Sequence, residues 1–172
     1  MGWLRFYWLL RLVHIYAAIV LVGAVFFNTV VLMPALRRIP PAHSAVVAQK
    51  IGAGLMWLGG AAILLLGVTG FVRLWMLGYF PAMLSRRALK IASFRWLALM
   101  IASWAALFGT GTLSATWYRT ILTKKLPYSA GLRELEDRRA EQARVSGWQD
   151  RLAYINLTLA VLAALGGIMA SS

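Results

Sequence analysis

The sequence contains four long stretches without a charged residue. They run from Leu12 to Leu36, from Ile51 to Val72, from Trp96 to Tyr118 and from Leu152 to Ser172. At about 1.5 Å per residue, a helix of any of these lengths can cross the roughly 30 Å hydrocarbon core of a bilayer. The stretches are apolar on every face, whereas membrane strands alternate between polar and apolar residues. We therefore predict an all-α integral membrane protein with four spanning helices.

The composition and the even number of spans define the expected architecture. Only 13% of the residues are charged, against roughly 25% in soluble proteins. We predict a single transmembrane domain over residues 1–172, folded as an antiparallel up-down-up-down bundle with both termini on one face. The only hydrophilic segment, residues 119–151, is expected to form a charged helical loop outside the membrane. It contains all five acidic residues: Glu134, Glu136, Asp137, Glu141 and Asp150.

The net charge of +13 arises from eighteen lysines and arginines at helix ends and in loops. Such side chains extend towards anionic lipid headgroups, so the expected partner is the lipid bilayer rather than nucleic acid. Eleven of the basic residues lie on the first and third connections, which favours a cytoplasmic location for these loops. We expect a multi-pass protein of the bacterial inner (cytoplasmic) membrane.

Small residues recur at helical spacing in the last three spans. In the second span, Ala53, Gly60 and Gly67 follow one another at seven-residue steps. Stripes of this kind let neighbouring helices approach closely, either within the bundle or in contact with other membrane subunits. The polar residues inside the spans, Thr69, Thr110 and Asn156 among them, are expected to make hydrogen bonds between helices.

One histidine, His14, lies inside the first apolar stretch, and Tyr7 and Arg11 precede it at helical spacing. An ionisable side chain at this depth is a candidate functional residue. In an antiparallel bundle, three methionines share its depth: Met76, Met100 and Met169. Because the chain has no cysteine, imidazole and thioether groups are the candidate ligands for copper or for haem iron. The alternative is that His14 bonds a carbonyl and the methionines fill gaps between helices.

The second histidine and the acidic residues have plainer interpretations. His43 follows two prolines after the first span, so we expect it in an exposed loop or helix cap, away from His14. The five carboxylates lie among arginines in the hydrophilic segment and are expected to form a solvated face rather than a metal site.

The stretch "LVHIYAAIVLVGAVFFNTVVLMPAL" resembles the first helix of the copper-resistance protein D (CopD) family and of its four-helix relatives, among them the HemJ-type protoporphyrinogen oxidases. The features that match are His14, Gly23 and Pro34. "LLGVTG" is similar to the family's second helix, "RRALKIASF" to the basic segment before its third, and "RLAYINLTLAVLAALGG" to its final helix. For the HemJ-type relatives, the resemblance implies haem b held partly by His14, with their lysine at Lys90. Histidines that many relatives carry in the third and fourth helices are missing here.

These observations leave three functional hypotheses open. The first is a CopD-like membrane protein with a haem or copper site at His14, the copper ligands being completed by Met76, Met100 and Met169. The second is a non-enzymatic accessory subunit, without a cofactor, that packs against helices of a larger complex. The third is a haem-dependent oxidoreductase of the HemJ type, in which Arg11, Lys90 and Arg95 attract an anionic tetrapyrrole. The sequence identifies no catalytic residue.

Overall fold

The computed structural model describes residues 2–79, 81, 90–117, 120–121 and 132–171. Within these residues the secondary structure is helical. The elements are α1 (Gly2–Phe26), the π-helix η1 (Phe27–Leu32), α2 (Met33–Leu36), α3 (Pro41–Met76), α5 (Ala92–Trp117) and α6 (Leu132–Ser171). Four segments are long and apolar enough to cross a membrane: Gly2–Leu36, Val46–Met76, Ala92–Trp117 and Ala140–Ala170. The prediction of an all-helical chain with four candidate spans is confirmed.

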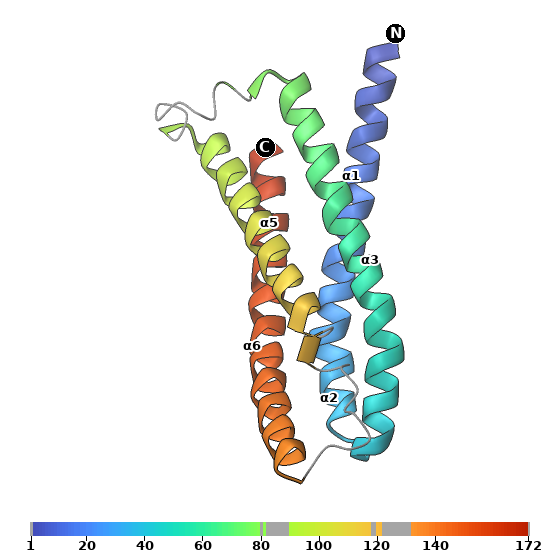
Figure 1. The fold of residues 1–172 in the computed structure, drawn as a ribbon. Coiled ribbons are helices and arrows are strands. Elements are labelled where there is room, and N and C mark those ends of the chain that lie inside the picture. Colours follow the sequence, from blue (N-terminus) through green and yellow to red (C-terminus); the bar gives the residue numbers. More distant parts are fainter. Residues whose placement is uncertain (1, 80, 82–89, 118–119, 122–131, 172) are drawn as a thin grey trace.

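The helices form two closely packed pairs. The most extensive contacts join α1 to α3 and α5 to α6, and α6 also contacts α1. Figure 1 shows the chain running along α1, returning along α3, and repeating this path through α5 and α6. Both chain ends therefore lie towards the same end of the bundle in this view, which we call the terminal end.

A π-helical stretch connects α1 to α2 and allows the first helix to pass through a proline. Pro34 has no amide hydrogen, so the α-helical bond to the carbonyl four residues earlier cannot form. In η1, directly before Pro34, bonds reach one residue further along the chain than in an α-helix. The helix ends at Leu36, the residue at which the first uncharged stretch also ends. The sequence did not predict the π-helical stretch.

All four long helices begin before the uncharged stretches that predicted them, α1 at Gly2 and α5 at Ala92. α3 begins at Pro41, where the fixed φ of proline suits the first helical turn. α6 runs without interruption through 40 residues, so the charged segment from Leu132 is an extension of the last span. The prediction of a charged loop helix separate from that span is corrected accordingly, because this segment contains no proline to end the helix. The rest of the predicted loop, and most of the basic interfacial helix predicted before α5, lie outside the described residues.

The centre of the bundle is small and the outside is apolar. One cluster of buried side chains joins all four long helices: Leu21, Ala62, Ile63, Leu107 and Ala160. Many large apolar side chains are exposed, among them Trp57 and Trp75 on α3 and Ile168 on α6. Exposed apolar surface of this extent is unfavourable in water and is compatible with contact to the lipid bilayer.

Polar side chains connect the helices, as predicted. Buried Thr29 donates a hydrogen bond to the carbonyl oxygen of Ala153 on α6 (3.3 Å). The hydroxyl of Thr110 on α5 bonds Asn156 on α6 (2.6 Å). Arg37, which follows α2, forms an exposed ion pair with Asp150 near the middle of α6 (2.7 Å). These contacts fix the position of α6 along the first helix and along α5.

Candidate functional site: His14 between two helices

His14 is held between α1 and α3 by a hydrogen bond to Thr69. Its Nδ1 atom lies 2.8 Å from the Thr69 hydroxyl oxygen. That hydroxyl lies 2.6 Å from the carbonyl oxygen of Leu65, one turn earlier on α3. Because a hydroxyl has one hydrogen, and the short bond to Leu65 takes it, Thr69 accepts a hydrogen bond from His14 Nδ1–H. The lone pair of the neutral ring is then on Nε2, the nitrogen that is free to act as a ligand.

Gly70, the next residue of α3, provides the space for the imidazole ring. A Cβ atom at this position would lie 3.3 Å from Cε1 of His14 and 3.9 Å from Nδ1. The ring therefore packs closely against the backbone of α3, one residue beyond its hydrogen-bond partner. Together Thr69 and Gly70 determine both the orientation and the tautomer of His14.

Arg73 extends the site by one helical turn towards the terminal end. Its Nη2 atom donates a long hydrogen bond to the hydroxyl oxygen of Tyr7 (3.5 Å), and its guanidinium carbon lies 5.6 Å from the centre of the Tyr7 ring. Its Nε atom is buried and has no hydrogen-bond partner within the described part of the chain. We use the term His14 site for Tyr7, His14, Thr69, Gly70 and Arg73.

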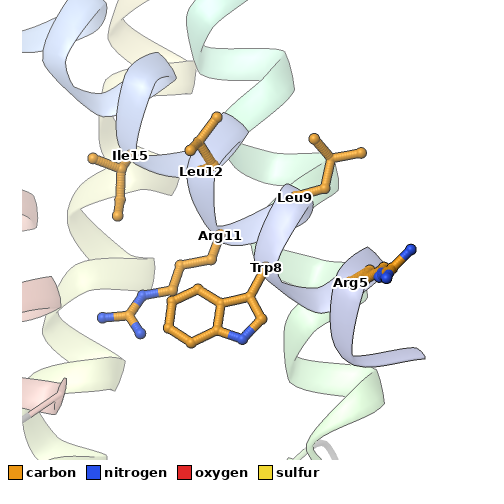
Figure 2. A pocket seen from close by; sticks show the side chains of 6 residues that line it. All are labelled: Arg5, Trp8, Leu9, Arg11, Leu12 and Ile15. Carbon is orange, nitrogen blue, oxygen red and sulfur yellow. The ribbon is translucent and has the colours of Figure 1, made fainter. Parts of the chain in front are cut away.

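The basic residues predicted for a cofactor site lie elsewhere around the terminal end. Arg11 extends over the ring of Trp8, with its guanidinium carbon 5.2 Å from the ring centre. Figure 2 shows both side chains at an open hollow of about 490 Å³, lined by Arg5, Trp8, Leu9, Arg11, Leu12 and Ile15. All six come from α1, and His14 is not among them. Lys90 and Arg95, near the start of α5, are exposed. Their role in binding a cofactor, and that of Arg11, stays a prediction.

The three methionines predicted as copper ligands lie at different places in the bundle. Met100 packs between α5 and α6, where its sulfur would lie 3.3 Å from a Cβ atom at Gly167. Met169 is exposed near the end of α6. Met76 is six residues beyond Gly70, which separates the two positions by about 9 Å along the axis of α3. The ligand set of His14 with these three methionines stays a prediction.

His43 and the carboxylates lie away from the His14 site. His43 is exposed in the first turn of α3, where its amide donates to the carbonyl oxygen of Pro40 (3.0 Å). Among the described residues, histidines and carboxylates form no group of three or more that could hold a metal ion.

The Thr69 contact leads to a prediction about the His14 ring. In Thr69→Val, the ring loses its acceptor, so we expect a mixture of neutral tautomers and a stability loss of about 1 kcal/mol, typical of one hydrogen bond. Thr69→Ser keeps the hydroxyl and should keep the Nδ1–H form. Histidine ¹⁵N NMR in detergent micelles measures the tautomer, with exposed His43 as the internal reference. Identical His14 spectra in wild type and Thr69→Val would contradict this assignment.

Comparisons of the chain with protein-family models, with curated proteins and with solved structures find no match. The likeness to the CopD family therefore stays a prediction that rests on the short stretches quoted above.

Proposed function

We propose that this chain is a CopD-like membrane protein that binds haem through Nε2 of His14. The observation that carries the proposal is the pair of hydrogen bonds at Thr69, which directs the Nδ1 hydrogen of His14 to a fixed acceptor. In metal-binding histidines, one ring nitrogen commonly donates to such a partner while the other holds the metal. His14 thus has the features of a ligand rather than of a histidine that only fills space.

Haem suits this site better than a bare copper ion. Copper bound by protein alone needs several side-chain donors, and softer ligands than carboxylates. A porphyrin supplies four nitrogen donors of its own, so the imidazole of His14 would be enough to attach it. Bound haem would supply one-electron chemistry. His14 would hold the group, and Thr69 and Gly70 would fix the orientation of the His14 ring.

The membrane arrangement is part of the same proposal. The four spans form an antiparallel up-down-up-down bundle in a bacterial inner membrane. The first and third connections lie on the cytoplasmic side, in agreement with the larger number of basic residues there. The His14 site would then lie nearer to the opposite membrane surface.

A second candidate function is that of an accessory subunit in a larger membrane complex. One observation favours it: four glycines in the middle of α3 have open space where a side chain would be. At Gly52, Gly54, Gly59 and Gly60, no described atom lies within 4 Å of an added Cβ. A helix surface of this kind allows a partner helix to approach closely.

The test is an optical spectrum with iron and copper analysis of the purified protein, next to His14→Ala. We expect a Soret band with stoichiometric iron in wild type, and at least a tenfold loss of haem affinity in His14→Ala, because loss of even a hydrogen-bond partner of a metal ligand typically costs about 10- to 100-fold. His43→Ala is the matched control, because it removes the other histidine, and it should keep the wild-type spectrum.

Other outcomes would replace the proposal. Stoichiometric copper without a Soret band, lost in His14→Ala, would indicate the copper site instead. A colourless, metal-free wild type whose properties do not change in His14→Ala would contradict cofactor binding and favour the accessory subunit.

A further inference from the structure

Arg73 combines a buried hydrogen-bond donor, which has no partner among the described residues, with a charge that no described acidic side chain neutralises. We propose that Arg73, with Tyr7, binds an oxyanion: a carboxylate or phosphate group of a ligand at the terminal end of the bundle. The geometry of the Arg73 side chain and the distribution of acidic residues carry this proposal independently of each other.

The guanidinium group of Arg73 has hydrogen-bond donors that its described neighbours do not use. Arginine presents five N–H groups in a planar fork, which matches the two oxygens of a carboxylate or phosphate. One of them, on Nη2, is directed at the hydroxyl oxygen of Tyr7 at the long distance of 3.5 Å. The Nε hydrogen, on a buried atom, has no partner among the described residues. Leaving a buried charged donor unpaired is unfavourable, so an acceptor from outside the chain would stabilise this arrangement.

The acidic residues of the chain cannot supply that acceptor. All five lie between positions 134 and 150, in the first half of α6. Figure 1 shows that this part of α6 lies at one end of the bundle, whereas Arg73, in the last turn of α3, lies towards the other. Five described basic residues surround the terminal end: Arg5, Arg11, Arg73, Lys90 and Arg95. The described acidic side chains therefore leave Arg73 without a counter-charge, which a bound molecule or a lipid would supply.

Two contacts within the chain stabilise the charge of Arg73 in part. The guanidinium lies over the Tyr7 ring, and the last turn of a helix favours a cation. Neither contact accepts the hydrogen of Nε. A bidentate oxyanion that bonds Nε and one Nη atom would do so, and the Tyr7 hydroxyl could donate to the same anion.

Two molecules can present this group at the membrane surface. One is the tetrapyrrole of the proposed function, through a propionate carboxylate, and this source rests on that proposal. The other is the phosphate of an anionic lipid. Both groups would accept hydrogen bonds from Arg73 through their oxygens. Two experiments distinguish the propionate from the lipid phosphate.

The first experiment compares binding of haem with binding of haem dimethyl ester, which lacks the free carboxylates. If the propionate is the ligand, wild type binds haem about tenfold more tightly than the ester, as expected for one charge-assisted bidentate contact. Arg73→Gln should lose this preference while its affinity for the ester stays unchanged, and Arg73→Lys, without the fork, should be intermediate. Arg5→Gln on the outer side of α1 is the matched control and should behave as wild type.

The second experiment measures the retention of phosphatidylglycerol by native mass spectrometry, after reconstitution without haem in mixed phosphatidylglycerol and phosphatidylcholine. If the lipid phosphate is the ligand, wild type and Arg5→Gln retain phosphatidylglycerol and Arg73→Gln loses most of it. Thermal unfolding of each variant shows whether the fold is intact.

The outcomes separate this inference from the proposed function. If Arg73→Gln loses the preference for haem over the ester, or loses phosphatidylglycerol, the oxyanion site is supported. The experiment in which the loss occurs identifies the molecule that supplies the oxyanion. The oxyanion site would be overturned by a folded Arg73→Gln variant that has the wild-type preference for haem over the ester and the wild-type retention of phosphatidylglycerol. A wild type that binds neither haem nor the ester contradicts the proposed function alone, and the lipid experiment then decides whether the oxyanion site exists.

Discussion

Gly166→Ala is expected to lower the free energy of unfolding by about 3 kcal/mol, at the upper end of the range for overpacking. An added Cβ would lie 2.9 Å from the carbonyl oxygen of Trp96, and 3.1 Å from both N and Cβ of Met100. Two of these three atoms belong to the backbone of α5, so no change of rotamer relieves the contact. The two helices of the α5–α6 pair would have to separate along their length.

The measurement is unfolding in mixed micelles of increasing denaturing detergent, followed by circular dichroism. Gly147→Ala is the matched control, because it lies in the same helix and has nothing within 4 Å of an added Cβ. It should stabilise α6 slightly, since alanine is favoured over glycine in a helix by up to about 1 kcal/mol. A Gly166→Ala variant as stable as Gly147→Ala would show that α5 and α6 do not approach each other this closely.

The second large effect is expected at Gly67, where Trp104 of α5 packs against α3. A Cβ atom at Gly67 would lie 2.5 Å from Cζ2 of Trp104, and the indole Nε1 donates to the carbonyl oxygen of Ile63 (2.9 Å). The ring is rigid and anchored, so Gly67→Ala has to displace it and break this hydrogen bond. We expect a loss of about 2 kcal/mol in the same unfolding measurement.

A double-mutant cycle isolates the cause of that loss. Trp104→Phe is destabilising alone, because it removes the hydrogen bond and part of the ring. In its presence, Gly67→Ala should have a much smaller effect, since the colliding atoms are gone, and the coupling should be about 1 kcal/mol or more. Additive effects would contradict a direct contact between these two positions.

Sequence analysis identified His14 and, on the same helix, Tyr7, but not which residues of α3 lie against them. His14 was evident as an ionisable residue in an apolar stretch. Thr69 was expected to make a hydrogen bond between helices, but its partner was not identified, and Gly70 was visible only as part of "LLGVTG". Their function depends on which face of α1 contacts which face of α3. Since both helices are apolar on all sides, no amphipathic pattern shows which face is turned inward.

The same uncertainty explains why Arg11 was favoured over Arg73. Arg11 is three residues before His14 on the same helix, which suggested proximity. In the structure its side chain lies over Trp8, while Arg73 reaches Tyr7 from the neighbouring helix. A residue supplied by another helix can be assigned to a site only when the register between the helices is known, and composition does not contain that information.

Helix boundaries show a comparable limit. The predicted spans were bounded by charged residues, and charge ends an uncharged stretch without ending a helix. Four long helices were correctly expected, whereas the continuity of α6 depends on the absence of a proline after Leu132. A search for helix-breaking residues, rather than for charges, would have joined the charged segment to the last span.

The continuity of α6 has a mechanical consequence. Forty residues in one helix are about 60 Å long, roughly twice the thickness of the hydrocarbon core. The charged half of α6 and the half packed against α5 therefore move together as one rigid helix. The polar half contains Asp150, which forms the ion pair with Arg37. A partner that tilts or rotates this half would also move Gly166, which lies close to Trp96 and Met100 of α5.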